Sequence, residues 1–252
     1  MSVKVEKKDG VLLVSIDRPK ARNAVDKTTA EELSAAFREF ENGDSSVAVL
    51  TGVGGNFCAG ADLKATAQGH PNRLKEDGDG PMGPTRTLLS KPVIAAVEGY
   101  AVAGGLELAL WCDLRVASQN AVFGVFCRRF GVPLIDGGTV RLPRLIGHSR
   151  ALDMILTGRE VKAEEALSFG LINRICEPGE ALETSLNLAR RLASFPQECL
   201  RADRLSSYQQ WGQSIDEALK REFVGGLPSL MSEGLSGAKN FEAGMGRSGK
   251  RL

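Results

Sequence analysis

The chain alternates short apolar runs with longer amphipathic stretches. Short apolar runs occupy Val11–Ile16, residues 47–50 and residues 92–97, and such runs are typical of strands buried in a sheet. Residues 28–41 carry apolar side chains at positions 30, 33, 36, 37 and 40, which is helical spacing. Thr28 and Glu31 are suited to form a capping box at the start of that helix. The alternation predicts βαβ units and a largely parallel sheet.

After residue 143 the pattern predicts mostly helices. Helical patterns extend over residues 149–156, 163–167, 181–195, 197–211 and 214–223. A length of 252 residues fits one large domain, or a core with a small appendage. We therefore predict a core domain at residues 1–196 and a helical C-terminal part at residues 197–252.

Two strand-like runs lead into turns rich in glycine and alanine. Residues 94–113 contain Gly104 and Gly105 at the start of a helix, with Glu107 just inside it. A helix start leaves backbone N–H groups free to bind negative charge. Residues 47–64 form the other unit, and together the two turns could bring two N–H groups to one oxygen atom. A carboxylate beside such donors suits proton abstraction next to a carbonyl, although a surface glutamate in a first helical turn would fit the pattern equally well.

These motifs resemble the crotonase (enoyl-CoA hydratase/isomerase) superfamily over nearly the whole chain, in order and at family spacing. The resemblance is carried by Arg22-Asn23-Ala24, Phe57-Cys58-Ala59-Gly60-Ala61-Asp62-Leu63-Lys64, residues 91–99, Gly104-Gly105-Leu106-Glu107-Leu108-Ala109, residues 137–143, Leu156-Thr157-Gly158 and Ala163-Glu164-Glu165-Ala166. It implies an α/β, crotonase-like fold of repeated ββα units with a helical C-terminal part.

The resemblance also implies roles for individual residues. The N–H groups of Ala61 and Gly104 would form an oxyanion hole for a thioester carbonyl, and Glu107 would be catalytic. Contacts to the acyl-CoA substrate are implied for the backbone around Asn23, Ala24, Ala59, Ala61 and Leu63, and also for Gly60, Asp62 and Cys127. Coenzyme A would enter as part of the substrate, with no separate cofactor. Residues 197–252 would assemble the chain into a homotrimer or a dimer of trimers.

One segment departs from the family pattern. Hydratases of this superfamily carry a second catalytic glutamate after Phe-Gly-x-Pro, whereas here Phe123-Gly124-Val125-Phe126 is followed by Cys127. We predict that Cys127 is a buried, inert thiol, because no histidine lies near it in sequence to activate it. Asp136 has two interpretations that stay open: a turn or capping aspartate before Gly137-Gly138, or a replacement acid/base facing Glu107.

Composition limits the classes of function. The chain is 42% hydrophobic and 25% charged, with a net charge of +1, which gives no footprint for nucleic acid or membrane. Five cysteines without a C-x-x-C pair fit a reducing compartment, so we predict a cytoplasmic protein. Two separated histidines predict no dedicated metal site.

Two further segments stand out along the chain. The turn-rich residues 65–87 predict a functional loop, which in the family covers the acyl pocket. Residues 250–252 predict a solvated basic tail.

The leading functional hypothesis is an enoyl-CoA hydratase. Hydration needs a second group to share the activation of water, whereas double-bond isomerisation works with one shuttling carboxylate, so an isomerase relying on Glu107 is the alternative. A non-catalytic binding protein with a crotonase fold is a further alternative, motivated by Cys127. RNA binding is disfavoured by the near-zero net charge.

Overall fold

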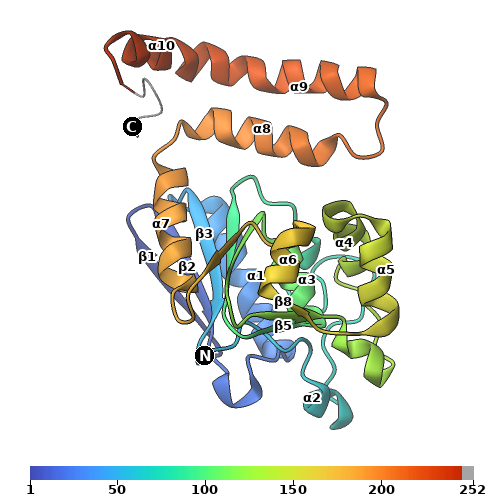
Figure 1. Ribbon diagram of the computed structural model, residues 1–252. Helices are drawn as coiled ribbons and strands as arrows, with labels where there is room; N and C mark the ends of the chain where they lie inside the picture. Colours follow the sequence, from blue (N-terminus) through green and yellow to red (C-terminus); the bar gives the residue numbers. More distant parts are fainter. Residues whose placement is uncertain (246–252) are drawn as a thin grey trace. The chain divides into compact units, whose positions relative to one another are not determined.

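A computed structural model describes residues 1–245 (Figure 1). The chain divides into two compact units, Met1–Leu192 and Ala193–Leu252, and each is described by itself. The division falls inside helix α7 (Ala181–Ala193), shortly before the predicted boundary at residue 196. The predicted basic tail at residues 250–252 lies outside the described residues.

The first unit is built around a six-stranded sheet in the order β1-β2-β3-β4-β6-β9. Its strands are β1 (Val3–Lys8), β2 (Val11–Ile16), β3 (Val47–Gly52), β4 (Val93–Val97), β6 (Leu114–Ser118) and β9 (Arg174–Cys176). Strand β1 pairs antiparallel with β2, and all other neighbours pair in parallel. The predicted α/β fold with a largely parallel sheet is confirmed.

Burial explains why the central strands are apolar along their whole length. All of β4 is buried, as is β3 from Val47 to Thr51, since parallel strands are covered on both faces. Strand β1 differs, because only Val3 is buried and its other five residues are exposed. Among the strands of residues 1–245, this strand forms one edge of the sheet and pairs with β2.

A second, three-stranded sheet holds the turn that precedes α3 (Gly104–Trp111). Its strands are β5 (Tyr100–Val102), β7 (Val122–Gly124) and β8 (Val161–Lys162), in the order β5-β7-β8. Strand β5 pairs in parallel with β7. It ends at Val102, two residues before the start of α3. The turn between β5 and α3 is therefore held in place by the three-stranded sheet before it and by the buried helix α3 after it.

The helix predicted at residues 28–41 is α1 (Lys27–Asn42). The predicted capping box of Thr28 and Glu31 is wrong: the N-cap is Asp26, whose carboxylate accepts a hydrogen bond of 2.9 Å from the N–H of Thr29. An aspartate just ahead of the helix satisfies a free N–H directly, so the helix begins before Thr28.

Helices α1 and α3 pack against each other in the core. The rings of Phe37 and Trp111 meet edge to face, with centroids 4.7 Å apart. The remaining helical segments of this unit are η1 (Pro19–Ala21), α2 (Leu63–Ala67), η2 (Pro84–Arg86), η3 (Phe126–Phe130), α4 (Gly138–Ile146), α5 (His148–Thr157), α6 (Ala163–Phe169) and α7. Among the helices of residues 1–245, none combines the length and apolar character needed to cross a bilayer.

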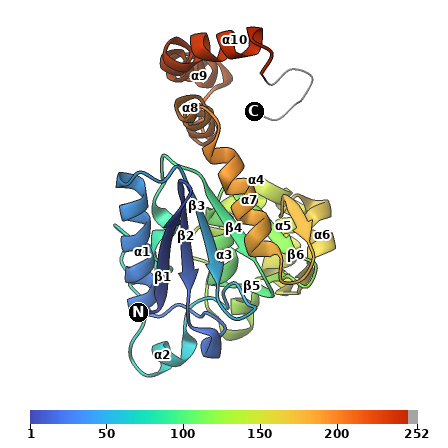
Figure 2. The same cartoon turned by 90° about the vertical axis from the view of Figure 1, so that its left-hand side faces the viewer.

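The second unit is helical, as predicted. Helices α8 (Gln197–Gln209) and α9 (Ile215–Ser229) lie side by side, and α9 continues through η4 (Leu230–Gly234) into α10 (Leu235–Glu242) (Figure 2). Helix α9 extends beyond the predicted end at residue 223, through two glycines and Pro228. Many large apolar side chains of this unit are exposed: Ile215, Leu219, Phe223, Val224, Leu227, Leu230, Met231, Leu235 and Phe241.

Candidate active site

The two glycine-rich turns predicted from the sequence lie next to each other. Cys58 donates its N–H to the carbonyl of Tyr100 at 2.9 Å, and Val102 donates back to the carbonyl of Cys58 at 3.1 Å. This pairing along β5 brings the first turn beside the start of α3. At Gly60, where φ is +96°, a Cβ atom would lie 2.9 Å from the backbone nitrogen of Gly104, so only glycine allows the two turns to come this close.

The predicted oxyanion donors are available at the junction of these turns. Within residues 1–245, neither the N–H of Ala61 nor that of Gly104 donates to a protein group. Gly104 is the first residue of α3, so its N–H has no partner inside the helix. Ala103, just before it, has φ 54° and ψ −126°, an unusual conformation for a residue with a side chain. Ala103 and Gly104 both line a cavity.

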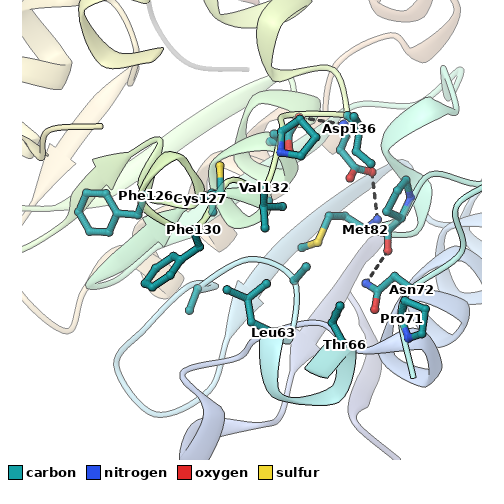
Figure 3. A pocket seen from close by; sticks show the side chains of 18 of the residues that line it. Leu63, Thr66, Pro71, Asn72, Met82, Phe126, Cys127, Phe130, Val132 and Asp136 are labelled. Atoms are coloured by element: carbon teal, nitrogen blue, oxygen red, sulfur yellow. Dashed lines mark hydrogen bonds between the residues drawn. The ribbon is translucent and has the colours of Figure 1, made fainter. Parts of the chain in front are cut away.

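A cavity of about 400 Å³ opens beside this junction (Figure 3). Leu63 and Thr66 of α2 lie on one side, and Phe126, Cys127 and Phe130 on another. The other lining residues are Ala59, Ala61, Pro71, Asn72, Leu74, Pro81, Met82, Ala103, Gly104, Glu107, Val132, Pro133, Ile135 and Asp136. The lining is mostly apolar, and its acidic groups are Glu107 and Asp136.

Glu107 lies in the first turn of α3 and is 3% exposed. Its Oε1 accepts hydrogen bonds of 2.8 Å from the N–H groups of Asp136 and Gly138. A Cβ atom at Gly138 would lie 3.0 Å from that oxygen, so a glycine there permits this short contact. Burial, reinforced by the negative charge of Asp136, raises the pKa of Glu107 to about 7. A carboxyl with a pKa near neutrality is suited both to give and to take a proton.

Asp136 is also buried, with 3% exposure. Its Oδ1 accepts a hydrogen bond of 3.0 Å from the N–H of Met82 and a second one from the hydroxyl of Thr85. Burial raises the pKa of Asp136 above its ordinary range. Asp136 thus precedes the N-terminus of α4 in a turn and also places a carboxylate beside Glu107 at the cavity wall. Its role as a replacement acid/base stays a prediction.

Cys127 lies in η3 and lines the same cavity, with 7% exposure. Burial raises the pKa of its thiol, and the negative charge of Glu107 raises it further. The side chain is therefore a neutral thiol at physiological pH. The predicted burial is observed, and the predicted lack of reactivity stays a prediction.

The residues predicted to contact coenzyme A fall into two groups. Ala59 and Leu63 line the cavity, whereas Asn23, Ala24, Gly60 and Asp62 are not among its lining residues. Asn23 is buried and donates from Nδ2 to the carbonyls of Val53 at 2.9 Å and Asn56 at 2.6 Å. Its side chain therefore links the chain segments that support the first turn.

Asp62 caps α2 and also pairs with a cation. Its Oδ1 accepts from the N–H groups of Lys64 at 3.0 Å and Ala65 at 3.2 Å, and its Oδ2 accepts from Arg18 at 2.9 Å. Arg18 donates as well to the carbonyl of Ala24. These contacts keep the pKa of Asp62 below its ordinary value despite partial burial. The side chain of Asp62 thus stabilises the turn, leaving backbone atoms as its contribution to a ligand.

Several lining residues were not anticipated. They are Pro71, Asn72, Leu74, Pro81 and Met82 of the 65–87 region, which was predicted as a functional loop that covers the acyl pocket in the family, without roles for single residues. The apolar residues inside this turn-rich stretch were the sequence feature that could have identified them as part of a cavity. Thr85 and the N–H groups that hold the two carboxylates had no signal at all, since backbone donors are invisible in a residue pattern.

Comparison with known proteins agrees with the geometry. The sequence model of the enoyl-CoA hydratase/isomerase family matches residues 6–219. Short-chain-enoyl-CoA hydratase of Clostridium acetobutylicum is 38% identical over 227 residues, covering 88% of this chain and 86% of the relative. Enoyl-CoA hydratase EchA19 of Mycobacterium tuberculosis is 39% identical over 237 residues, covering 91% and 88%.

The fold is equally similar to solved structures. The crystal structure of an enoyl-CoA hydratase from Mycobacterium tuberculosis H37Rv superimposes with a TM-score of 0.90 at 38% identity, covering 96% of both chains. Sequence, fold and the order of the motifs thus point the same way, and the chain belongs to the enoyl-CoA hydratase/isomerase family of the crotonase superfamily.

Proposed function

We propose that this protein adds water to the double bond of enoyl-CoA thioesters, with Glu107 and Asp136 as its acid/base pair. The observation that carries the proposal is the placement of two buried carboxylates, both with raised pKa values, at one wall of an apolar cavity. Each carboxylate has one oxygen anchored by two donors. Within residues 1–245, the other oxygen of each has no hydrogen-bond partner and is left for the reactants.

The thioester carbonyl would be bound by the N–H groups of Ala61 and Gly104. These donors favour the enolate oxygen that develops as water adds, and losing one such donor typically costs about 2.7–4 kcal/mol of transition-state stabilisation. The carboxyl of Glu107, three residues into the same helix, then lies near the carbons conjugated to that carbonyl.

Hydration needs one proton to be taken and one to be given. An ionised carboxylate of the pair takes a proton from water as the water oxygen bonds to C3, and the protonated partner delivers a proton to C2. Two coupled carboxyls share protons as a unit, and a pKa of about 7 at Glu107 keeps both protonation states available at neutral pH. The reaction requires no redox or metal chemistry, so coenzyme A would enter only as part of the substrate.

A second candidate is double-bond isomerisation with Glu107 as the sole proton shuttle. Cys127 favours it, because a neutral thiol stands where hydratases of the superfamily carry their second glutamate. The two candidates differ in Asp136, which hydration requires and isomerisation does not. A non-catalytic binding role is disfavoured by the raised pKa of Glu107 and the free oxyanion donors.

The acyl group is proposed to be neutral and apolar. Within residues 1–245, no lysine, arginine or histidine lines the cavity, so a substrate carboxylate would find no counter-ion there. At about 30 Å³ per water-sized group, a cavity of about 400 Å³ holds roughly a dozen non-hydrogen groups. That is more than a four-carbon acyl thioester needs, so medium-length hydrocarbon chains fit the site.

We also propose that the second unit mediates assembly into trimers or pairs of trimers. Its helices expose many large apolar side chains, among them Phe223, Met231 and Leu235, and extensive exposed apolar surface marks protein interfaces. Sedimentation that shows only monomer at micromolar concentration would exclude this assembly.

A cytoplasmic location is proposed because all five cysteines are free thiols.

The test of function compares two isosteric variants with a thiol variant. Wild type is incubated with straight-chain enoyl-CoAs in water enriched in both heavy oxygen and deuterium, and mass spectrometry identifies the products, the oxygen taken up and the deuterium exchanged at C2. Glu107→Gln should abolish both hydration and exchange of the proton at C2. Asp136→Asn should abolish hydration alone, and Cys127→Ala should retain it. Hydration that persists in Asp136→Asn would refute the carboxylate pair, and migration of the double bond without water uptake in wild type would favour the isomerase.

A further inference from the structure

Arg141 joins the two backbone segments that position the carboxylates. Its Nη1 donates to the carbonyl of Asp136 at 2.9 Å, and its Nη2 donates to the carbonyl of Thr85 at 2.7 Å. Thr85 belongs to η2, and Asp136 belongs to the turn that precedes α4. One guanidinium thus fixes the distance between two segments that are 51 residues apart in the chain.

Each of these segments supplies hydrogen-bond donors to a carboxylate. The first segment gives the N–H of Met82 and the hydroxyl of Thr85 to Asp136. The second gives the N–H groups of Asp136 and Gly138 to Glu107. A change in their separation would therefore move both carboxyl groups relative to the cavity.

The guanidinium lies directly against the turn. At Gly137, where φ is +95°, a Cβ atom would lie 2.1 Å from Nη1 of Arg141. Arg141 is not among the residues that line the cavity, so its effect on a bound substrate is indirect. Its positive charge also lowers the pKa of both Glu107 and Asp136, against the effect of burial.

We infer that Arg141 is a positioning residue, whose two hydrogen bonds to the carbonyls of Thr85 and Asp136 hold Glu107 and Asp136 in register. The charge of the same guanidinium has a tuning role, because it opposes the effect of burial on the pKa of both carboxyl groups. This inference rests on the proposed function, because it takes the two carboxylates as the reacting groups. Two substitutions separate the paired hydrogen bonds of the guanidinium from its charge. Lysine keeps the positive charge but lacks the planar guanidinium, whereas glutamine loses the charge.

The experiment compares Arg141→Gln and Arg141→Lys with Arg144→Gln as a matched control. Arg144 is an exposed arginine on the same helix. The pH dependence of kcat and KM is measured for each variant that circular dichroism shows to be folded. In parallel, the side-chain carboxyl of Glu107 is titrated by ¹³C NMR in protein labelled at glutamate, with Glu107→Gln to assign the signal.

Arg141→Gln should lower kcat about 100-fold, the scale of a misplaced reacting group, with KM near that of wild type. Its Glu107 carboxyl should titrate at higher pH than in wild type. Arg141→Lys should keep the pH profile but lose kcat, and Arg144→Gln should match wild type in both. If Arg141→Lys keeps the wild-type kcat, the two hydrogen bonds of the guanidinium do not position the carboxylates. This outcome can be read even if Arg141→Gln does not fold.

The NMR titration separates the failure of this inference from the failure of the proposed function. If wild type hydrates no enoyl-CoA, the proposed function fails, yet the coupling of Arg141 to Glu107 is still measured. If wild type is active and the titration of Glu107 is unchanged in folded Arg141→Gln, the tuning role is wrong.

Discussion

The replacement of Glu107 by glutamine should abolish activity and at the same time stabilise the fold. Glutamine keeps the shape of the side chain, and its carbonyl oxygen can still accept from the N–H groups of Asp136 and Gly138. What it removes is the ionisable group. A buried charge that is free to react is a liability for stability, and Glu107 is 3% exposed.

The size of the effect follows from the pKa of Glu107, which burial raises from an ordinary 4.5 to about 7. Because the folded state holds this proton more tightly than the unfolded state does, folding is favoured at low pH and loses free energy as the pH rises from 4.5 to about 7. At about 1.4 kcal/mol per pKa unit, the loss reaches about 3 kcal/mol above pH 7. Glutamine cannot ionise and avoids this loss at every pH.

The assay is thermal or denaturant unfolding of both proteins between about pH 5 and about pH 8.5. For a chain of this size, about 3 kcal/mol corresponds to a difference in Tm of roughly 6–12 °C. The difference should be small at the acidic end and grow toward the alkaline end. Glu31→Gln, on the exposed side of α1, is the control and should show no such trend. A difference in Tm that stays constant with pH, or a less stable Glu107→Gln at alkaline pH, would refute the reasoning.

Other perturbations test the oxyanion turn, the thiol, the glycine beside Glu107 and the cavity. Ala61→Pro removes one N–H donor, so acyl-CoA turnover should fall by at least about 100-fold; unchanged calorimetric binding and unchanged turnover in a folded variant would exclude that donor. Cys127→Ala should change kcat less than about threefold and cost about 1 kcal/mol of stability through lost packing, measured by steady-state kinetics and urea unfolding. Gly138→Ala should lower kcat about tenfold by displacing Oε1 of Glu107, and wild-type kcat would show that the site relaxes. Across a series of enoyl-CoAs, kcat/KM should be higher for medium-length chains than for the four-carbon substrate.

The sequence predicted the parts of the fold whose signals are local. Buried strands read as apolar runs, and the glycine pairs marked the turns at which Glu107 and the oxyanion donors lie. The α1 cap was misplaced, because Thr28 fits a capping pattern as well as Asp26 does and only the backbone geometry separates the two. Helix α9 was predicted too short for a related reason: Gly225, Gly226 and Pro228 are poor helix formers, yet the helix continues through them to Ser229.

The candidate site was harder to predict, because most of its contacts are long-range. Asp136 could be singled out as unusual, but its hydrogen bonds come from Met82 and Thr85, more than 50 residues earlier in the chain. The family motif implied a backbone contact of Asn23 with coenzyme A, but it carried no signal for the side chain, which is buried in hydrogen bonds to the carbonyls of Val53 and Asn56. A pattern identifies which residues matter, and the folded chain decides whether the side chain or the backbone is used.

The exposed edge strand β1 affects the tendency of this protein to aggregate at high concentration. An unpaired strand edge can template the addition of another chain and so start aggregates. Here β1 carries Lys4, Glu6, Lys7 and Lys8 on exposed positions, and Lys4 forms an ion pair of 2.6 Å with Asp17. An incoming strand would have to strip water from these charges and break that pair. The charges on β1 therefore oppose edge-to-edge aggregation, and replacing these lysines with valine should promote precipitation.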